Sequence, residues 1–435
     1  MSDNQKVRVY AVYGFLGDQL QAPINEIVYS GAEDCFLVAD FLSEDTYQIL
    51  KKLGSDHFYA RFLENMLSVQ VLRAMYARRI RLVCNAGALN PKDCAEALKA
   101  KLDLVGIPLK VAYIDGDNLA DAMETFGYFP NSKDQQPLSA DSLDKVISST
   151  VYIGSEHIAN AFRQGADIVV AGRVTDCGMT LGALMSQLPW QYHRDWDKMA
   201  AGAIAGHLLS CGGQSARPVS PGYLSPREIA QLSYPGVDVS ADGTVHLVCA
   251  NKISPESALS QIFYGISSTR YIDPDVIIDL SGMEVAQVDD YTVAVSGIKG
   301  LPEPEKLRAM VLLKGDKHTM TGIFQIPRVH EETYGDEGIR ELIRLRIAAG
   351  GVHLPQENLQ TERLGVSNTD VFYQVHAIFK TRLYAALAKA QVPSLIVSGM
   401  NGSYGNVPHL EDEVLIWDSL VDRSLVESRL ALTML

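Results

Sequence analysis

The sequence lacks the features that mark a membrane or secreted protein. No stretch approaches the roughly 18 to 20 apolar residues of a membrane span, and residues 1–6 have neither the basic nor the apolar region of a signal peptide. Only six cysteines occur among 435 residues, and none belongs to a C-x-x-C pair. We therefore expect reduced thiols, a cytoplasmic location and no membrane partner.

Positive charge is also scarce. Lys and Arg together number 38 against 52 Asp and Glu, which gives a formal net charge of −14. A chain that wraps nucleic acid needs the opposite sign, so we expect no nucleic-acid partner. Hydrophobic residues make up 47% of the chain, which is enough for the core of an ordinary globular protein.

Several catalytic signatures are absent as well. The sequence has no G-x-S-x-G and no H-E-x-x-H motif, which argues against the corresponding serine hydrolases and zinc peptidases. The opening turn at Gly14–Asp18 (GFLGD) is not a G-x-G-x-x-G, and no acidic residue at the expected distance completes a dinucleotide fingerprint. No organic cofactor is therefore identified, although a divalent metal is compatible with the residues described below.

The first half of the chain alternates short β-branched runs with amphipathic helical stretches. This rhythm predicts an α/β fold, with a mostly parallel, doubly wound sheet and helices on both of its faces. We expect strands at 7–13, 35–40, 81–84, 110–114 and 166–171, and helices at 58–78, 91–105 and 181–188.

The second half changes character. Strand-like segments separated by turn residues predict antiparallel pairs in a smaller α+β second domain. The expected strands are 244–249, 276–280, 291–295, 371–379 and 394–398, and the expected helices are 337–349 and 382–389. We divide the chain into an α/β domain (1–225), a strand-rich α+β segment (226–315) and a C-terminal α/β segment (316–435), and we expect a homo-oligomer.

Ligands of an open parallel sheet collect at the carboxyl ends of its strands, and four polar segments fall at such ends. The first contains Gly14, Gly17 and Asp18, where backbone N–H groups can hold an anion. A plain strand-to-helix turn explains these residues equally well. The second contains Asn85, which can hydrogen-bond a substrate carboxylate or carbonyl, and Asn90, which can bind substrate or simply cap the next helix.

The third segment contains Gly172, Arg173 and Asp176, and it directly follows an apolar strand. A guanidinium beside a helix N-terminus suits a carboxylate or phosphate. An internal Arg–Asp pair, with Thr175 or Asp176 as a helix cap, is the structural alternative.

The fourth segment contains His207, Cys211 and Gln214. His207 and Cys211 are four residues apart and share one helix face, so the histidine can activate the thiol or both can bind a metal. A histidine that is simply satisfied within an apolar core is the alternative.

These blocks together resemble the acyclic terpene utilisation family. The resemblance rests on Ile168–Asp176 (IVVAGRVTD), Leu181–Met185 (LGALM), Asp195–Asp197 (DWD), Gly206–Gln214 (GHLLSCGGQ) and Asn85–Pro91 (NAGALNP). It implies a cytosolic α/β protein that acts in the breakdown of branched isoprenoid acids as acyl-CoA esters, near a hydration or carbon–carbon cleavage step.

The sequence departs from the pattern of that family in three places. Cys249–Ser254 (CANKIS) replaces a Gly-Thr-Gly-Gly type of loop, and Asn401–Asn406 (NGSYGN) replaces a more Gly-rich stretch. Larger relatives add a ferredoxin-like domain, for which this chain is expected to be too short. These departures make a specialised biosynthetic role compatible with the sequence.

Our main hypothesis is a lyase or hydro-lyase that acts on a branched carboxylic acid or its acyl-CoA thioester. Arg173, together with Asn85 and the Gly14–Gly17 loop, would hold the carboxylate or carbonyl and stabilise an enolate. His207 or Asp176 would move the proton.

A divalent metal, if one is used, would bind through Asp176, Asp197 and His207. The alternatives are a non-catalytic binding or scaffold subunit that retains the pocket, and a nicotinamide-dependent oxidoreductase. The oxidoreductase is suggested only by the fold pattern, which is poor evidence for function.

Overall fold

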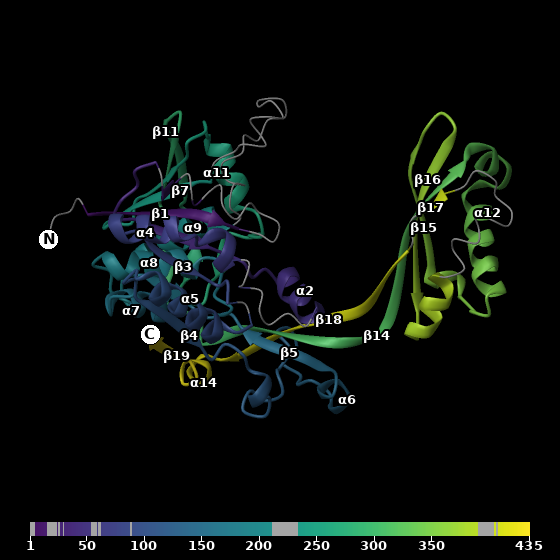
Figure 1. The fold of residues 1–435 in the computed structure, drawn as a ribbon, viewed down its shortest axis with the longest axis horizontal. Helices are drawn as coiled ribbons and strands as arrows, with labels where there is room; N and C mark the ends of the chain where they lie inside the picture. The colour runs from purple at the N-terminus through teal and green to yellow at the C-terminus, as the bar shows by residue number, and fades with distance from the viewer. Residues whose placement is uncertain are drawn as a thin grey trace. The chain divides into compact units, whose positions relative to one another are not determined.

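The computed structural model describes residues 5–14, 24, 27–28, 30–53, 59, 62–87, 89–210, 234–389, 404–405 and 408–435. The chain has mixed α and β structure with several sheets (Figure 1). Two compact units can be distinguished. Unit 1 comprises 1–143, 148–311 and 417–435, and unit 2 comprises 144–147 and 312–416. The three segments proposed from the sequence stay predictions.

The largest sheet belongs to unit 1 and is mixed rather than parallel throughout. Its ten strands are ordered β11-β12-β8-β7-β1-β2-β3-β6-β4-β19. The central strands β1 (Lys6–Tyr13), β2 (Phe36–Ala39), β3 (Arg81–Cys84), β6 (Ile168–Val170) and β4 (Val111–Asp115) are parallel. The flanking strands β7 (Gly236–Ser240), β8 (Val245–Val248), β12 (Thr292–Ser296), β11 (Glu284–Asp289) and β19 (Ala431–Met434) pair antiparallel.

The parallel arrangement is therefore confined to the centre of this sheet, where each strand is followed by a helix-containing connection. Among the flanking strands, short turns join β7 to β8 and β11 to β12, and such turns permit only antiparallel pairing. The strands expected near residues 244–249 and 291–295 are confirmed as β8 and β12.

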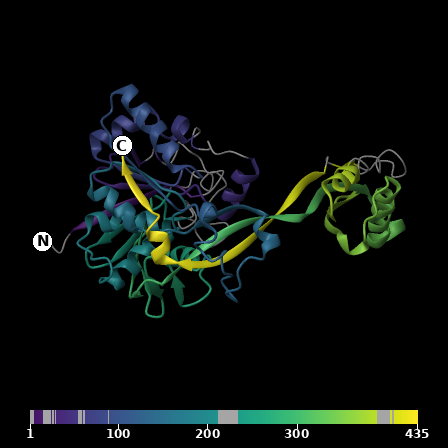
Figure 2. The same ribbon diagram turned by 90° about the horizontal axis from the view of Figure 1, so that it is seen from below.

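Helices pack against both faces of this sheet (Figures 1 and 2). Successive residues of a strand point to opposite faces. Leu37 shares a core with helices α4 (Val69–Arg78) and α5 (Pro91–Val105), whereas the ring of the preceding residue, Phe36, contacts Phe162 of α7 (Glu156–Arg163). Helix α8 (Gly178–Gln187) packs beside α7, and α9 (Trp196–Ser210) packs beside α8, on this second face of the sheet.

The remaining elements of unit 1 surround the sheet. A three-stranded antiparallel sheet consists of β9 (Arg270–Ile272), β10 (Ile277–Asp279) and β13 (Lys299–Leu301). Its described residues also form the helices α2 (Glu44–Leu53), α6 (Ala140–Leu143), α11 (Pro255–Ile262) and α14 (Arg423–Glu427), a π-helical turn (Phe62–Met66) and a 3-10 turn (Ala120–Ala122). Strand β5 (Val146–Val151) contains residues of both units.

Unit 2 has the element order β14 (Lys306–Pro327), α12 (Arg328–Ala349), β15 (Leu359–Val366), β16 (Asp370–Phe379), the helical residues 382–389, β17 (Tyr404–Gly405) and β18 (His409–Asp422). Its antiparallel sheet is ordered β15-β16-β14-β17, and β18 also pairs with β14. The first residues of β14 and the last of β18 belong to unit 1. Ile339 of α12 and Ala385 share one apolar core with the sheet.

When β17 and β18, which both pair with β14, are taken together as the last strand, this is the βαββαβ order of a ferredoxin-like unit. The expectation that the chain is too short for such a unit is therefore wrong. The unit comprises 144–147 and 312–416, and its strands β14 and β18 have residues in both units. No helix among the described ranges is long and apolar enough to cross a membrane.

Candidate functional site

Polar residues follow four of the five parallel strands. Asp40 follows β2, Asn85 follows β3, Asp117 comes two residues after β4, and Arg173 comes three residues after β6. Because the carboxyl ends of parallel strands lie along one edge of a sheet, these four residues lie on the same side of unit 1. The sequence patterns selected Asn85 and Arg173, whereas Asp40 and Asp117 were assigned no role in binding.

Arg173 is almost fully buried, with 1% of its side chain exposed. Its guanidinium carbon lies 4.3 Å from the centre of the Tyr152 ring, and Nη1 donates a hydrogen bond to the Leu42 carbonyl. Nη2 lies 3.7 Å from Glu44 Oε1, and Nη1 lies 3.7 Å from Asp176 Oδ1. The protein itself therefore compensates the charge of Arg173.

Gly172 places the backbone of Arg173 close to a buried carboxylate. Asp117 Oδ2 accepts the Arg173 N–H at 2.8 Å and the Thr150 hydroxyl at 3.1 Å. A Cβ atom at position 172 would lie 2.2 Å from Asp117 Oδ1, so only glycine fits there without rearrangement. Gly172 and Asp117 thus fix the direction in which the chain leaves β6.

The side chain of Asn85 is fully buried and bonded within the protein. Its Oδ1 accepts the Phe41 N–H at 2.5 Å, and its Nδ2 donates to Asp40 Oδ1 at 2.7 Å. Asp40 Oδ1 also accepts the Leu42 N–H at 3.1 Å. Asn85 therefore shapes the segment whose Leu42 carbonyl receives Arg173, which makes it a positioning residue in this arrangement.

The charges around Arg173 influence one another. Burial, followed by the charge of Asp176, raises the pKa of Asp40, although Arg173 opposes this rise. Burial also raises the pKa of Glu44, but the Arg173 charge and a hydrogen bond from Tyr152 outweigh it, so that the net shift is downward. Burial raises the pKa of Tyr152 to about 12. The buried guanidinium thus stabilises the charged form of the carboxylates nearest to it.

A cavity of about 400 Å³ lies directly beside these residues. Its polar lining includes Glu44, Asp176 and Arg308. Asp176 and Arg308 are about half exposed, at 47% and 46% of their side chains. The apolar lining comes from β9, from the segment before β14 and from the ends of β14 and β18: Tyr271, Ile272, Pro274, Pro304, Leu307 and Leu420.

Arg308 and Lys306 are the two cations in the lining of this cavity, and Arg308 is the one that contacts Tyr152 and Glu44. Its guanidinium carbon lies 4.9 Å from the centre of the Tyr152 ring. Its Nη1 lies 3.3 Å from Glu44 Oε1, and its Nη2 lies 2.8 Å from Asp418 Oδ1. Arg308 was not selected from the sequence, because it lies within a long strand and no motif marks it.

The backbone before α8 presents Asp176 to the cavity. The Thr175 hydroxyl donates to Asp273 Oδ2 at 3.0 Å, and Asp273 is fully buried in the turn between β9 and β10. Burial, followed by the charge of Asp275, raises the pKa of Asp273 to about 7. Asp176 therefore lies two residues before α8 and directly after Thr175, whose side chain is bonded to the buried Asp273.

His207 lies behind the cavity wall. Its Nε2–H donates to the Tyr264 carbonyl at 3.1 Å, which leaves the lone pair on Nδ1, and Nδ1 is buried without a hydrogen-bond partner among the described residues. Gly206 brings α9 against Cys177, because a Cβ there would lie 2.6 Å from the Cys177 carbonyl oxygen. The imidazole centre is 6.1 Å from the ring of Tyr271, which lines the cavity. Burial lowers the pKa of His207 and favours the neutral ring.

The other candidates from the sequence have different outcomes. Asn90 caps α5, since its Oδ1 accepts the Asp93 N–H at 3.1 Å. Gly14 follows β1 directly. Four further candidates lie outside the described residues: Gly17, Asp18, Cys211 and Gln214.

The three residues proposed as metal ligands, Asp176, Asp197 and His207, do not lie together. Asp197 is half exposed and bonded to Lys299 Nζ at 2.8 Å and to the Gly300 N–H at 2.9 Å. It precedes His207 by ten residues on α9, which corresponds to about 15 Å along a helix axis. Within the described part of the chain, no group of three or more His, Cys, Asp or Glu side chains has the geometry of a metal site. Asp176, Asp197 and His207 therefore cannot share one ion here.

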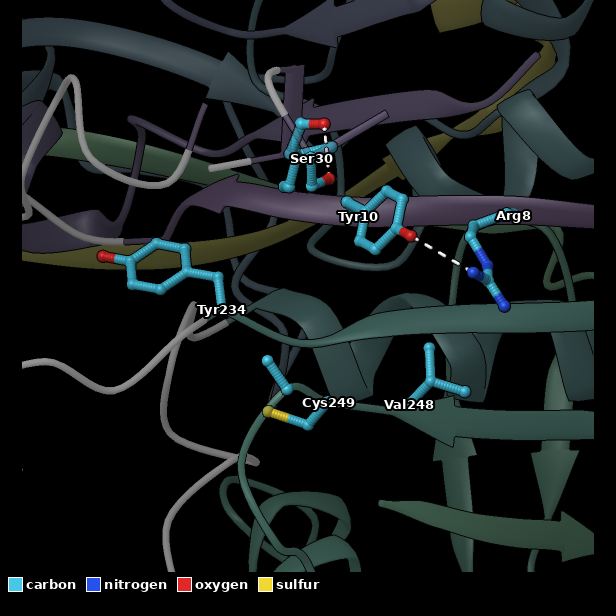
Figure 3. A pocket seen from close by; sticks show the side chains of 8 residues that line it. Arg8, Tyr10, Ser30, Tyr234, Val248 and Cys249 are labelled. Carbon is cyan, nitrogen blue, oxygen red and sulfur yellow. Dashed lines mark hydrogen bonds between the residues drawn. The ribbon is translucent and has the colours of Figure 1, made fainter. Parts of the chain in front are cut away.

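A second cavity, of about 270 Å³, lies beside β1, β7 and β8 (Figure 3). Arg8, Tyr10 and Cys249 are among its lining residues. Arg8 donates hydrogen bonds from Nε and Nη2 to the two carboxylate oxygens of Asp238, each at 2.5 Å. Its Nη1 donates to the Tyr10 hydroxyl at 3.2 Å. Because Arg8 is engaged in this way, the cavity beside Asp176 is the stronger candidate for chemistry.

Comparison with known proteins identifies the family. No curated protein matches the sequence. The family described as "Acyclic terpene utilisation family protein AtuA" matches residues 7–432, which is nearly the whole chain. The match includes both Asp176 and Arg308 as well as the ferredoxin-like unit 2. The chain therefore belongs to the acyclic terpene utilisation family AtuA, whose name indicates a role in terpene metabolism.

Proposed function

We propose that this protein is a hydro-lyase that removes or adds water next to the carbonyl of a branched carboxylic acid thioester. The observation that carries the proposal is the position of Asp176. Its half-exposed carboxylate lines an amphipathic cavity and lies 3.7 Å from the buried Arg173. A carboxylate held by a fixed cation at the wall of a small-molecule cavity suits general base catalysis.

The reaction needs one proton acceptor and one site for developing negative charge. Asp176 would take the proton from the carbon next to the carbonyl, and the electrons of that C–H bond would form an enolate. The enolate would then expel the hydroxyl group from the next carbon, and protonated Asp176 would return the proton to it. A C–H and a C–O bond break, a C=C bond forms, and one water leaves.

Arg308 is placed to stabilise the enolate oxygen. It is the half-exposed guanidinium of the cavity, and a preorganised donor directed at developing charge can contribute several kcal/mol, about 10² to 10³ in rate. Arg173, which the sequence favoured for this role, is assigned to holding Asp176 and Glu44 because only 1% of its side chain is exposed. His207 supports the wall behind Tyr271.

The apolar side of the cavity supports a branched hydrocarbon substrate. Ile272, Leu307 and Leu420 face the same cavity as Asp176, and a volume of about 400 Å³ is within the range of small-molecule sites.

The test is an assay of branched enoyl and 3-hydroxyacyl thioesters in deuterated water. Mass spectrometry would record deuterium incorporated next to the carbonyl, and ultraviolet absorbance would record the conjugated product. Loss of a general base costs about 10² to 10⁴ in rate, so Asp176→Asn should lower exchange by that factor.

Glu44→Gln is the matched comparison, because it also removes a carboxylate 3.7 Å from Arg173. We expect it to lower exchange less than tenfold, while Asp197→Asn, outside the cavity, should have no effect. Full exchange in a folded Asp176→Asn protein would exclude Asp176 as the base. Thioester binding without exchange or turnover in the wild type would instead indicate a binding protein.

A further inference from the structure

The three-stranded sheet carries a row of aliphatic side chains on one face. Ile272 of β9 pairs directly with Ile277 of β10, which pairs directly with Leu301 of β13. Ile272 is 66% exposed and Leu301 is 40% exposed. Directly paired residues lie on the same face of a sheet, so the three side chains form one continuous row about 10 Å long.

This aliphatic row is continuous with the proposed active site. Ile272 itself lines the cavity that contains Asp176. The turn that joins Ile272 to Ile277 supplies Pro274, and the segment after Leu301 supplies Pro304, both of which also line that cavity. The apolar surface therefore extends from the cavity onto the outer face of β9, β10 and β13.

Charged residues border the row on the same face. Asp279 lies two residues from Ile277 on β10. It pairs directly with Arg270 of β9 and with Lys299 of β13, which lie two residues from Ile272 and Leu301. Charged side chains therefore bound the aliphatic row on the side away from the cavity. Stable protein interfaces bury about 800 Å² on each partner, far more than three side chains provide, whereas a single extended hydrocarbon chain matches a narrow strip.

We propose that the aliphatic row, Ile272, Ile277 and Leu301, is a subsite for the hydrocarbon chain of a substrate that is too long for the cavity alone. The inference rests on the proposed function, because the reactive end of that substrate would lie at Asp176. The substrate class is then an extended acyl chain whose reactive carbons enter the cavity and whose distal methylenes cover the row.

The test measures binding of unreactive saturated carboxylates of increasing chain length by calorimetry, alongside turnover of the matching enoyl thioesters. Each methylene removed from water tightens binding about fourfold. We expect this increment to continue in the wild type beyond the chain length that fills the cavity. Ile272→Thr and Leu301→Thr, which keep a strand-forming residue, should each weaken long chains about tenfold. Leu301→Thr, which does not line the cavity, should leave the binding of short chains unchanged.

Val288→Thr is the control, since Val288 is a 54% exposed aliphatic residue on β11 of the large sheet. The Val288→Thr protein should keep the full gain in binding affinity per added methylene. If Ile272→Thr and Leu301→Thr also retain it, the subsite is excluded. If they instead dissociate an oligomer in sedimentation experiments, the row is a protein interface and the inference fails.

The two proposals can fail separately. If no thioester turns over but carboxylate binding depends on chain length through Ile272 and Leu301, the hydro-lyase assignment is wrong and the subsite stands. If Asp176-dependent turnover is observed but the two threonine variants bind long chains normally, the reaction stands and the subsite is wrong.

Discussion

Replacing Arg173 with methionine would remove a buried cation and keep an unbranched side chain. The substitution deletes the charged hydrogen bond to the Leu42 carbonyl, worth about 1.5–3 kcal/mol, and the contact with the Tyr152 ring, worth about 0.5–2 kcal/mol. It also removes the cation that favours ionisation of the buried Asp40. We therefore expect Arg173→Met to lower the free energy of unfolding by about 3–5 kcal/mol.

The pH dependence of this loss would identify its cause. Arg173 makes the net pKa shift of Glu44 downward, although burial acts in the opposite direction. A group with a lowered folded-state pKa stabilises the fold above its unfolded-state pKa, and that contribution is lost as the pH falls through the folded-state pKa. The difference between wild type and Arg173→Met should thus be largest near neutral pH and shrink below about pH 4.5.

The assay is urea denaturation followed by circular dichroism across this pH range, with Arg8→Met as the matched control. Arg8 also makes a two-pronged contact with a carboxylate, Asp238, but its side chain is 44% exposed. Exposed ion pairs contribute about 0–1 kcal/mol. If Arg173→Met destabilises the protein no more than Arg8→Met, or equally at every pH, the buried cation does not hold its neighbours as argued.

Three further predictions concern the framework of the site. Gly172→Ala should cost about 1–3 kcal/mol, because the added Cβ would lie 2.2 Å from a buried Asp117 oxygen; an unchanged melting temperature would contradict this. Asn90→Ala should cost about 1 kcal/mol through loss of the α5 cap and leave thioester exchange intact, and reduced exchange would show a role beyond capping. Burial, followed by the charge of Asp275, raises the pKa of Asp273 to about 7, so its contribution to stability should decline as the pH rises from about 4 through about 7. Asp273→Asn should remove this decline in urea denaturation, and an unchanged pH profile would refute the assignment.

The centre of the large sheet could be predicted from the sequence, because each parallel strand there is a short apolar run that ends at a polar or glycine residue. The strand at 81–84 and the helix at 91–105 are confirmed with the expected bounds. Placing Asn85 and Arg173 on one edge of the sheet needed only the rule that parallel strands share their direction. The pattern of the first half therefore located the region of the site.

The composition of the site could not be predicted in the same way. Glu44, Tyr152 and Arg308 come from three distant segments, and only the fold brings them to Arg173. A sequence pattern also cannot show which charge is buried. Arg173 has the motif, but the cavity exposes Arg308 instead.

The ferredoxin-like order of unit 2 could not be predicted from the sequence, for a related reason. Its strand β14 spans Lys306–Pro327 and has residues in both units, so this strand runs through the boundary expected between residues 315 and 316. The helix expected at 337–349 is confirmed as the second part of α12, which has a break in its helical backbone at Gly335. Sequence periodicity found the element but not the ferredoxin-like order in which it lies.

The balance of charge in the cavity bears on whether the substrate is a free acid or a thioester. Removing a proton next to a free carboxylate creates a second negative charge on the substrate, whereas a thioester enolate carries one. Arg308 offers a single half-exposed guanidinium, and Glu44 and Asp418 already lie within 3.3 Å of it. Arg173 is buried beneath this layer and compensated by its own carboxylates. Lys306, the other cation of the lining, is already bonded to Gln135 Oε1 at 2.8 Å. Two cations that the protein itself engages stabilise a monoanion more readily than a dianion, so the thioester is the form of the substrate that this arrangement favours.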